Sequence, residues 1–155
     1  MTPGINAAKK AKIPFEIHEY SHDATSESFG LEAAEKLNIP TKQVFKTLVV
    51  SLDAKELAVG VIPVSSKLSM KKIAKAAGVK KAEMAEKLAV ERSTGYVLGG
   101  VSPLGQKKRL RTLIDATAEN FPTIFVSAGR RGLEIELSVK DLVDLTKGVL
   151  ADICQ

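Results

Sequence analysis

Apolar positions recur along the chain in patterns that predict short strands separated by short helices. An alternating or nearly continuous apolar pattern is typical of a strand, and a run without polar breaks indicates burial on both faces. The predicted strands are residues 15–20, 44–52, 56–64, 109–115, 123–128 and 133–137. The second and third are joined by a turn at Asp53 and Ala54 and are expected to form a hairpin.

Two of these strands give expectations about faces. In residues 15–20, Phe15 and Ile17 alternate with polar residues, which places Glu16, His18 and Tyr20 on the opposite face. In residues 133–137 (LEIEL) the three apolar side chains point one way.

Helix signals lie between the strands. Thr2 followed by Pro3 predicts a helix over residues 3–12, Ser69 caps one that ends at Gly78, and Ser138 begins a last helix that Gly148 terminates. Residues 31–37 are expected to form a helix with Leu31, Ala34 and Leu37 on one face, and residues 82–90 also favour a helix.

This pattern predicts an α+β fold in one domain over residues 1–155, because strand hairpins alternate with helices. Hydrophobic residues make up 45% and charged residues 26%, which is ordinary for a globular protein. Trp is absent and aromatic residues are only 5%, which argues against a stacking platform for single-stranded nucleic acid. Contact with nucleic acid is therefore expected to be made through phosphates.

Charge and cysteine content bear on partners and location. The net charge of +5 favours polyanionic partners without requiring them. The single cysteine, Cys154, cannot form an internal disulfide and is expected in a frayed tail as an incidental thiol. No apolar run reaches the length of a signal peptide core or a membrane span, so a cytoplasmic location is expected.

The stretch from Arg92 to Arg111, RSTGYVLGGVSPLGQKKRLR, is the most distinctive of the chain. It holds four of the eleven glycines, and Pro103 restricts its shape. Glycines leave the backbone N–H groups of this stretch uncovered by side chains, and Lys107, Lys108 and Arg109 follow them in the sequence. This combination suits an anionic ligand or a developing oxyanion. The alternative is a long hairpin turn whose basic residues are simply solvated.

Lys46 is the most informative single residue, because it interrupts an apolar strand. An ammonium group there must meet an anion, reach solvent or lose its proton. It either extends from an edge with its stem on apolar surface, or emerges into a pocket where it holds a phosphate or a carbonyl oxygen.

Other chemistry finds little support. His18 and His22 are four residues apart, but on a strand and a loop this spacing does not bring them onto one metal ion, so no metal is expected. Ser102 lacks the G-x-S-x-G pattern, and no cofactor motif is present. Lysines 71, 72, 75, 80 and 81 form a second basic cluster that either is solvated or follows phosphates, and Arg130 and Arg131 share that ambiguity.

Three motifs, FKTLVV, RSTGYVLGGVSPLGQKKRL and IFVSAGRRGLEIEL, resemble in order and spacing those of the YbaK family of aminoacyl-tRNA deacylases, which is similar to the editing domain of bacterial prolyl-tRNA synthetases. The resemblance also covers MTP, KIPFEIHEY and the DAT…FG segment, and so nearly the whole chain. Arginine in GRR replaces the lysine of GKR in relatives, which keeps the charge.

The resemblance implies a mixed, partly closed sheet flanked by helices, and hydrolysis of cysteine mischarged onto tRNA(Pro) in a complex with prolyl-tRNA synthetase. It implies attack by the substrate's own thiol, with neither a cofactor nor a metal. The alternatives are an alanine deacylase acting on the same tRNA and a non-catalytic module that binds tRNA or a synthetase. The catalytic residues implied are Lys46, Gly99, Gly100, Val101 and Ser102; the substrate-binding residues are Tyr20, Phe29, Thr47, Pro103 and Ser127; and the candidate tRNA contacts are Lys107, Lys108, Arg109, Arg130 and Arg131.

Overall fold

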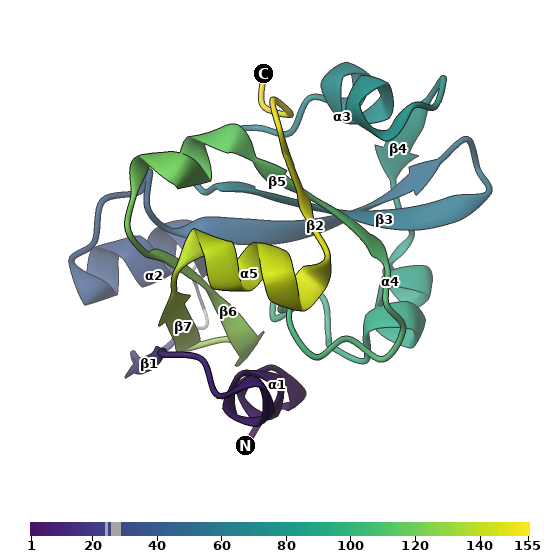
Figure 1. The fold of residues 1–155 in the computed structure, drawn as a ribbon. Coiled ribbons are helices and arrows are strands. Elements are labelled where there is room, and N and C mark those ends of the chain that lie inside the picture. Colours follow the sequence, from purple (N-terminus) through teal and green to yellow (C-terminus); the bar gives the residue numbers. More distant parts are fainter. Residues whose placement is uncertain (24, 26–28) are drawn as a thin grey trace.

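The computed structural model describes residues 1–23, 25 and 29–155, without the side chain of residue 29. Its strands form two sheets with helices packed around them (Figure 1). The elements in chain order are α1 (Pro3–Ala11), β1 (Glu16–Glu19), α2 (Phe29–Leu37), β2 (Phe45–Leu52), β3 (Glu56–Pro63), α3 (Met70–Ala77), β4 (Ala82–Met84), α4 (Lys87–Thr94), β5 (Arg111–Asp115), the 3₁₀ helix η1 (Ala116–Asn120), β6 (Ile124–Arg130), β7 (Leu133–Leu137), α5 (Val139–Thr146) and β8 (Val149–Ala151).

The larger sheet contains five strands in the order β4-β2-β3-β5-β8. β2 and β3 form the expected hairpin, with Lys46 opposite Ile62. β5 runs parallel to β3, and β8 runs parallel to β5. The glycine-rich stretch therefore joins α4 to a parallel strand, which excludes its interpretation as a hairpin turn between two strands.

The smaller sheet is antiparallel, in the order β1-β7-β6, and the expected turn after Arg130 joins β6 to β7. The two sheets meet where Val44 bridges Phe125, whose N–H donates to the carbonyl of Gln43 at 3.1 Å. This single junction gives the mixed, partly closed arrangement, and the α+β class is confirmed. No helix among the described residues is long and apolar enough to cross a membrane.

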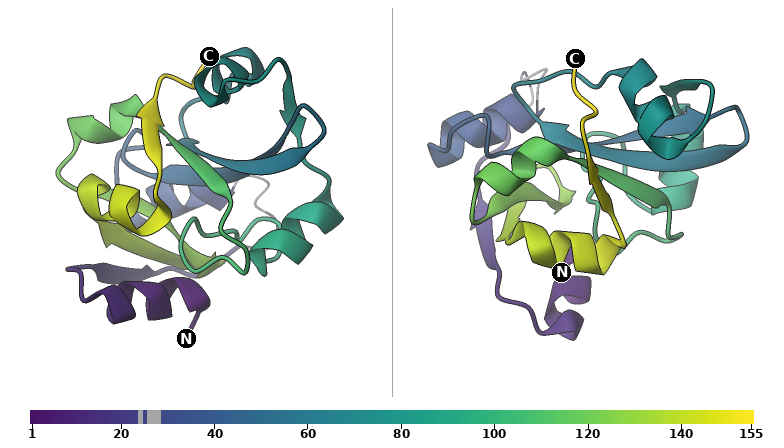
Figure 2. Two further views of the ribbon diagram at one scale, coloured as in Figure 1. Left: turned by 45° about the vertical axis from the view of Figure 1, so that its right-hand side comes forward. Right: turned by 45° about the horizontal axis from the view of Figure 1, so that its top comes forward.

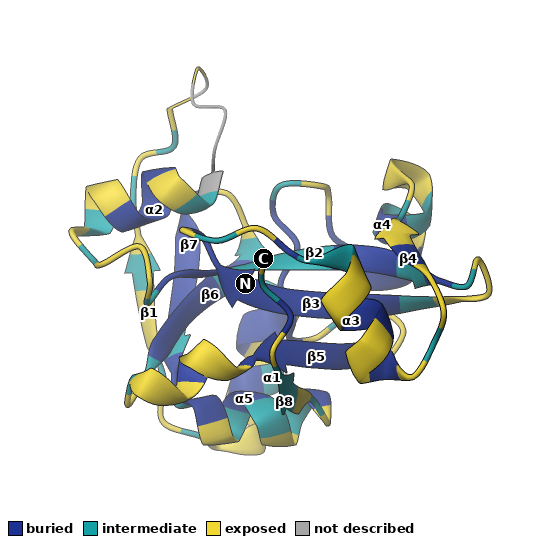
Figure 3. Ribbon diagram, turned by 90° about the horizontal axis from the view of Figure 1, so that it is seen from above, coloured by how far each residue is buried: buried dark blue, intermediate teal, exposed yellow. Residues whose placement is uncertain are grey.

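The core has two main parts, one on each face of the five-stranded sheet. One lies between the two sheets and includes Phe45, Ile135 and Leu142 of α5, all at most 1% exposed. The other lies under α3, where Ile73 and Ile62 are fully buried. Figure 3 shows β3 and β5 buried along most of their length, while the helices expose their outer faces. The continuous apolar run of β2 and β3 follows from this burial on both faces.

The predicted N-caps of α1, α3 and α5 are confirmed. The side chains of Thr2, Ser69 and Ser138 each accept a backbone N–H three residues on, at 3.1–3.2 Å. These bonds satisfy N–H groups that a helix leaves unpaired at its start. α3 is capped by Gly78 as predicted, whereas α5 ends at Thr146 and is capped by Lys147, which takes the left-handed conformation with φ 56°, one residue before Gly148.

The prediction of a helix over residues 82–90 is wrong in its first part. Residues 82–84 form β4, which pairs with the edge of β2, and Ala82 lies opposite Leu52. The helix begins only at Lys87. Pairing with a distant strand outweighs the local helical tendency of this segment.

In two N-terminal elements burial does not follow the apolar positions. In β1, Ile17 is 36% exposed, while the His18 ring packs on Phe125 with centroids 5.0 Å apart. Within β1 only His18 is partly covered, whereas Glu16, Ile17 and Glu19 are exposed. In α2, Leu31 is 43% exposed and Ala34 is buried, because the helix approaches Val64 so closely that only small side chains fit.

The C-terminal residues are ordered, contrary to the expected frayed tail. β8 adds to the sheet, Ile153 is fully buried, and Cys154 bridges Leu68. The Ile153 N–H donates to the Asp115 carboxylate at 3.1 Å. Burial, with the Asp115 charge next in effect, raises the pKa of the Cys154 thiol to about 12 and keeps it protonated.

Candidate active site

Lys46 lines a cavity of about 410 Å³, a volume typical of small-molecule sites. The cavity lies between β2, the start of the 95–110 loop and the turn from β6 to β7. Its walls are formed by Tyr20, Gly30, Phe45, Lys46, Thr47, Leu48, Met84, Leu98, Gly99, Val101, Ser127, Arg130, Arg131 and Glu134. The fold thus brings together eight of the residues singled out from the sequence, from four separate segments.

The Lys46 ammonium group has no hydrogen bond or ion pair with any described residue. Burial lowers the pKa of Lys46 below its usual value, and the charge of Lys67 adds to this shift. A half-buried cation without a protein partner is costly unless an anion or a polar oxygen meets it. Lys46 can therefore contact a phosphate or a carbonyl oxygen placed in the cavity.

The neighbouring Thr47 is a second cavity residue with an unpaired polar group. Its hydroxyl is buried and makes no hydrogen bond within the described chain. A buried unsatisfied hydroxyl costs about 1–3 kcal/mol, which a ligand can remove by accepting or donating a hydrogen bond.

Glu134 is a cavity residue that the sequence pattern did not reveal. It is 6% exposed, and its carboxyl group forms no hydrogen bond or ion pair with the described residues. Burial raises the pKa of Glu134 to about 8. Burial also raises the pKa of Tyr20, and the Glu134 charge raises it further. A positively charged ligand group entering the cavity would find in Glu134 a carboxyl group ready to ionise.

The loop between α4 and β5 forms one wall through Gly99 and Val101. Gly99 has φ 94°, a conformation that favours glycine. The Gly100 N–H already donates to the Val97 carbonyl at 2.9 Å, so it is not available to a ligand. A Cβ on Gly100 would lie 3.0 Å from the Cα of Arg130, which shows how tightly the loop abuts the β6–β7 turn.

Three of the predicted site residues lie away from the cavity wall. Gly100 is behind it, and Ser102 is fully buried, with its oxygen accepting the Leu104 N–H at 3.1 Å. The Tyr96 hydroxyl donates to the Leu104 carbonyl at 2.6 Å and so fixes the same part of the loop. Pro103 lines a second groove on the other side of the loop. These residues can shape the loop but do not reach the cavity.

The basic candidates separate into two groups. Arg130 and Arg131 line the Lys46 cavity, whereas Arg109 lines the second groove. Lys107 and Lys108 are exposed, and their backbone N–H groups donate to carbonyls at the end of α4 at 2.9 Å, which anchors the loop. The side chain of Phe29 lies outside the described residues, so the prediction for it stays open.

The two histidines bind different partners. His22 Nδ1 lies 2.7 Å from the buried Glu32 carboxylate. His18 Nε2 lies 3.0 Å from Glu136 and 3.8 Å from Glu16, and the ligand atoms of these three residues lie within 4.8 Å of one another. This group could hold a metal ion, but it sits outside the Lys46 cavity lining, and Glu136 also accepts the Thr123 hydroxyl at 2.5 Å.

Among the residues lining the cavity, the described structure offers no activated nucleophile. Ser127 is the serine of the wall, and its oxygen accepts the Gly129 N–H at 3.1 Å without a hydrogen bond to a base. Its described lining contains no cysteine or histidine. The described site therefore has charged and polar groups that could hold a polar substrate, but no side chain arranged to attack it.

The chain is similar in sequence to known proteins. The model of the aminoacyl-tRNA editing domain matches residues 27–145. The chain is 38% identical over 154 residues, 98% of it and 92% of the relative, to the "Putative Cys-tRNA(Pro)/Cys-tRNA(Cys) deacylase EbsC" of Enterococcus faecalis. It is also 28% identical to an uncharacterised protein, YwhH, of Bacillus subtilis, over 84% of the chain and 83% of that relative.

Solved structures share the fold. One is titled "Crystal structure of a putative trans-editing enzyme for prolyl tRNA synthetase", with a TM-score of 0.86 and 21% identity over 99% of this chain and 95% of that one. The crystal structure of a hypothetical protein gives a TM-score of 0.88 and 23% identity over 99% and 100% of the two chains.

Proposed function

The chain belongs to the family of aminoacyl-tRNA editing domains, and we propose that it is a trans-editing deacylase that removes cysteine from mischarged tRNA(Pro). The observation that carries this proposal is the cavity itself. It holds an ammonium, a carboxyl and a hydroxyl group without partners among the described residues, on Lys46, Glu134 and Thr47, and no activated nucleophile. Such a site suits a substrate that brings its own charges and its own nucleophile.

The aminoacyl end of a tRNA offers a match for each group. Its α-ammonium can pair with Glu134, which then ionises because an adjacent positive charge lowers a carboxyl pKa. Lys46 can hold the phosphate of the terminal nucleotide or the ester carbonyl oxygen. Gly99 and Val101 line the cavity, and their N–H groups are the proposed oxyanion donors; the Gly100 N–H is already used.

The attacking group is then the thiol of the mischarged cysteine. Its sulfur bonds to the ester carbonyl carbon, the bond to the 3′ oxygen breaks, and this oxygen takes a proton; water hydrolyses the resulting cyclic thioester. A thiol with a pKa of about 8.5 is partly ionised near neutral pH. Holding it against its own carbonyl lowers the barrier by several kcal/mol through positioning.

Selectivity follows from the chemistry. A pocket that accepts a small side chain cannot strongly reject another of nearly the same size by binding alone. A requirement for the thiol excludes correctly charged proline and the other small amino acids. Prolyl-tRNA synthetase is the proposed partner, because an enzyme of this size holding the acceptor end needs another protein to select the tRNA.

The test is release of amino acid from Cys-tRNA(Pro) and Ala-tRNA(Pro), with and without prolyl-tRNA synthetase. The proposal predicts loss of cysteine, faster with the synthetase, while alanine stays attached. Faster loss of alanine would instead identify an alanine deacylase that uses water. Binding of tRNA without loss of either amino acid would leave a non-catalytic module and overturn the proposal.

A further inference from the structure

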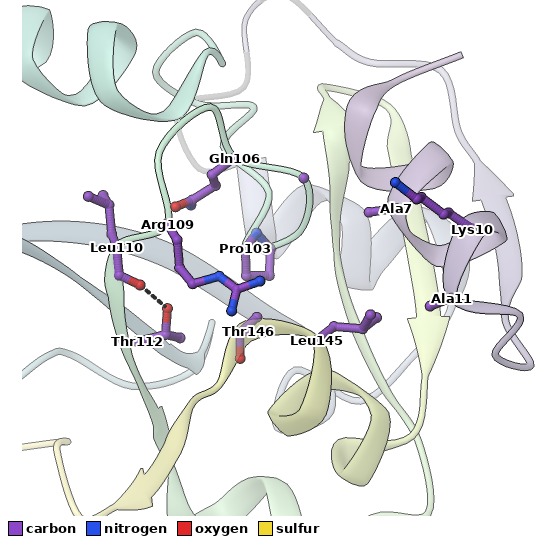
Figure 4. Close-up of a pocket in the computed structure, with 11 residues that line it drawn as sticks. Ala7, Lys10, Ala11, Pro103, Gln106, Arg109, Leu110, Thr112, Leu145 and Thr146 are labelled. Atoms are coloured by element: carbon purple, nitrogen blue, oxygen red, sulfur yellow. Dashed lines mark hydrogen bonds between the residues drawn. The ribbon is translucent and has the colours of Figure 1, made fainter.

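A second groove of about 320 Å³ lies on the other side of the 95–110 loop (Figure 4). Its walls come from α1, the loop, the start of β5 and the end of α5. The lining residues are Ala7, Lys10, Ala11, Pro103, Gly105, Gln106, Arg109, Leu110, Thr112, Leu145 and Thr146. The sequence predicted no binding site formed by these residues together, although Pro103 and Arg109 were singled out individually.

The groove carries positive charge only. Lys10 extends from α1 and Arg109 from the loop on the facing wall, as Figure 4 shows. No acidic residue lines the groove, and neither cationic side chain forms an ion pair or hydrogen bond within the described part of the chain. Unpaired cations on two walls attract an anionic group into the groove.

The rest of the lining limits what the anion can be attached to. The Thr112 and Thr146 hydroxyls donate to the carbonyls of Leu110 and Leu142, and the Gln106 amide donates to Ser102. The remaining walls are formed by apolar groups such as those of Pro103 and Leu145. An anion joined to a group with an apolar face, such as a phosphate joined to a ribose, therefore fits better than a small free anion.

The groove and the Lys46 cavity share one loop. Gly99 and Val101 line the cavity, while Pro103, Gly105, Gln106, Arg109 and Leu110 line the groove. The loop rests directly on α1: a Cβ on Gly105 would lie 2.4 Å from the Pro3 carbonyl oxygen. Figure 2 shows the same neighbourhood of α1 and this loop from two further directions. Lys107 and Lys108 belong to the same loop and are exposed.

We propose that this groove binds a phosphodiester of the tRNA whose 3′ end occupies the Lys46 cavity, with Lys10 and Arg109 on the phosphate and the adjoining sugar on the apolar wall. The inference rests on the proposed function and adds α1 to the tRNA footprint. In this arrangement the tRNA backbone runs along the basic loop, from the Lys46 cavity toward α1.

The test compares Lys10→Glu with Lys9→Glu. Both lysines are exposed on α1, but only Lys10 lines the groove, so the two variants have the same net charge and differ in the position of the change. Each is assayed on full-length Cys-tRNA(Pro) and on cysteine esterified to the 3′ oxygen of adenosine, which is too short to reach the groove. Binding of uncharged tRNA(Pro) is measured against salt concentration.

For Lys10→Glu we expect KM for Cys-tRNA(Pro) to rise about tenfold, equivalent to about 1.4 kcal/mol, relative to Lys9→Glu. The salt dependence of tRNA binding should weaken by about one unit of log–log slope, and kcat/KM for the short ester should match that of Lys9→Glu. Equal effects of the two variants on tRNA, or an equal loss on both substrates, would overturn the proposal. If the wild type hydrolyses neither substrate, the proposed function fails, and the binding data alone decide on the groove.

Discussion

Lys46, Thr47 and Glu134 each bring a polar group without a partner among the described residues to one cavity. Each is costly in the empty protein, because buried polar groups are normally hydrogen-bonded. In the proposed function the aminoacyl end of a tRNA supplies complementary groups, and pairing with them would remove this cost. Two predictions at the scale of single residues follow from this arrangement.

Lys46→Ala should lower the deacylation rate about 100-fold or more while the protein stays folded, because the proposed function places the Lys46 charge on the terminal phosphate or the ester carbonyl oxygen. Circular dichroism and single-turnover rates on Cys-tRNA(Pro) would measure both effects. Lys67→Ala removes a nearby exposed lysine outside the cavity lining and is the matched control. Near-normal turnover in Lys46→Ala would remove Lys46 from the site.

Glu134→Gln should change how stability depends on pH. The pKa of about 8 in the folded protein lies above the ordinary value of 4.5, so between these pH values the unfolded chain binds fewer protons than the folded one. The stability of the wild type should therefore fall as pH rises from about 4.5 to 8, by up to about 4 kcal/mol, and this fall should be absent in Glu134→Gln. Urea unfolding at pH 5 and pH 8 tests this; parallel behaviour of the two proteins would show that the carboxyl group is not held neutral.

The sequence allowed prediction of Lys46 but not of Glu134, for a physical reason. A lysine inside an apolar run conflicts with its surroundings, and that conflict is visible locally. Glu134 sits in a regular alternation, LEIEL, which indicates a solvent-exposed polar face. Burial of Glu134 results from segments far away in the chain, including Tyr20 and the 95–110 loop, that enclose the same cavity.

At the scale of elements, the 95–110 loop is held by contacts at both edges. Gly100 abuts the β6–β7 turn, and Gly105 abuts α1. Gly100→Val should strongly reduce turnover, because its side chain would push the loop away from Arg130 and displace Gly99 and Val101 from the cavity wall. Gly100 does not have a positive φ, so the effect would come from this contact rather than from backbone strain.

Comparison with Gly100→Ala separates these causes, since the smaller side chain should give a smaller loss in kcat. Steady-state rates on Cys-tRNA(Pro) and thermal unfolding are the measurements. Turnover in Gly100→Val equal to that of the wild type would mean that the loop only connects α4 to β5.

Elements with local signals were predicted well. The caps at Thr2, Ser69 and Ser138 and the β2–β3 hairpin depend on residues close in sequence. The short strands β4 and β8 were not predicted, because each exists only through pairing with a strand far away in the chain. Short edge strands carry too few residues for a pattern to identify them.

At the scale of the whole molecule, the C-terminal residues close the five-stranded sheet. Ile153→Ala should lower the free energy of unfolding by about 2–5 kcal/mol, because Ile153 is fully buried between α3 and the sheet. Val149→Ala, at a position 60% exposed in β8, should change stability by less than about 1 kcal/mol. Urea unfolding of both variants would check this, and equal small effects would contradict the ordered tail.

The measurement that tests the central claim most directly is single-turnover deacylation of Cys-tRNA(Pro) beside Ser-tRNA(Pro), in the presence of prolyl-tRNA synthetase. Serine has almost the same size as cysteine but lacks the thiol, so the cavity should bind both esters similarly. The account predicts rapid release of cysteine and a far slower release of serine. Equal rates would mean that the enzyme activates water, and would contradict attack by the substrate's thiol.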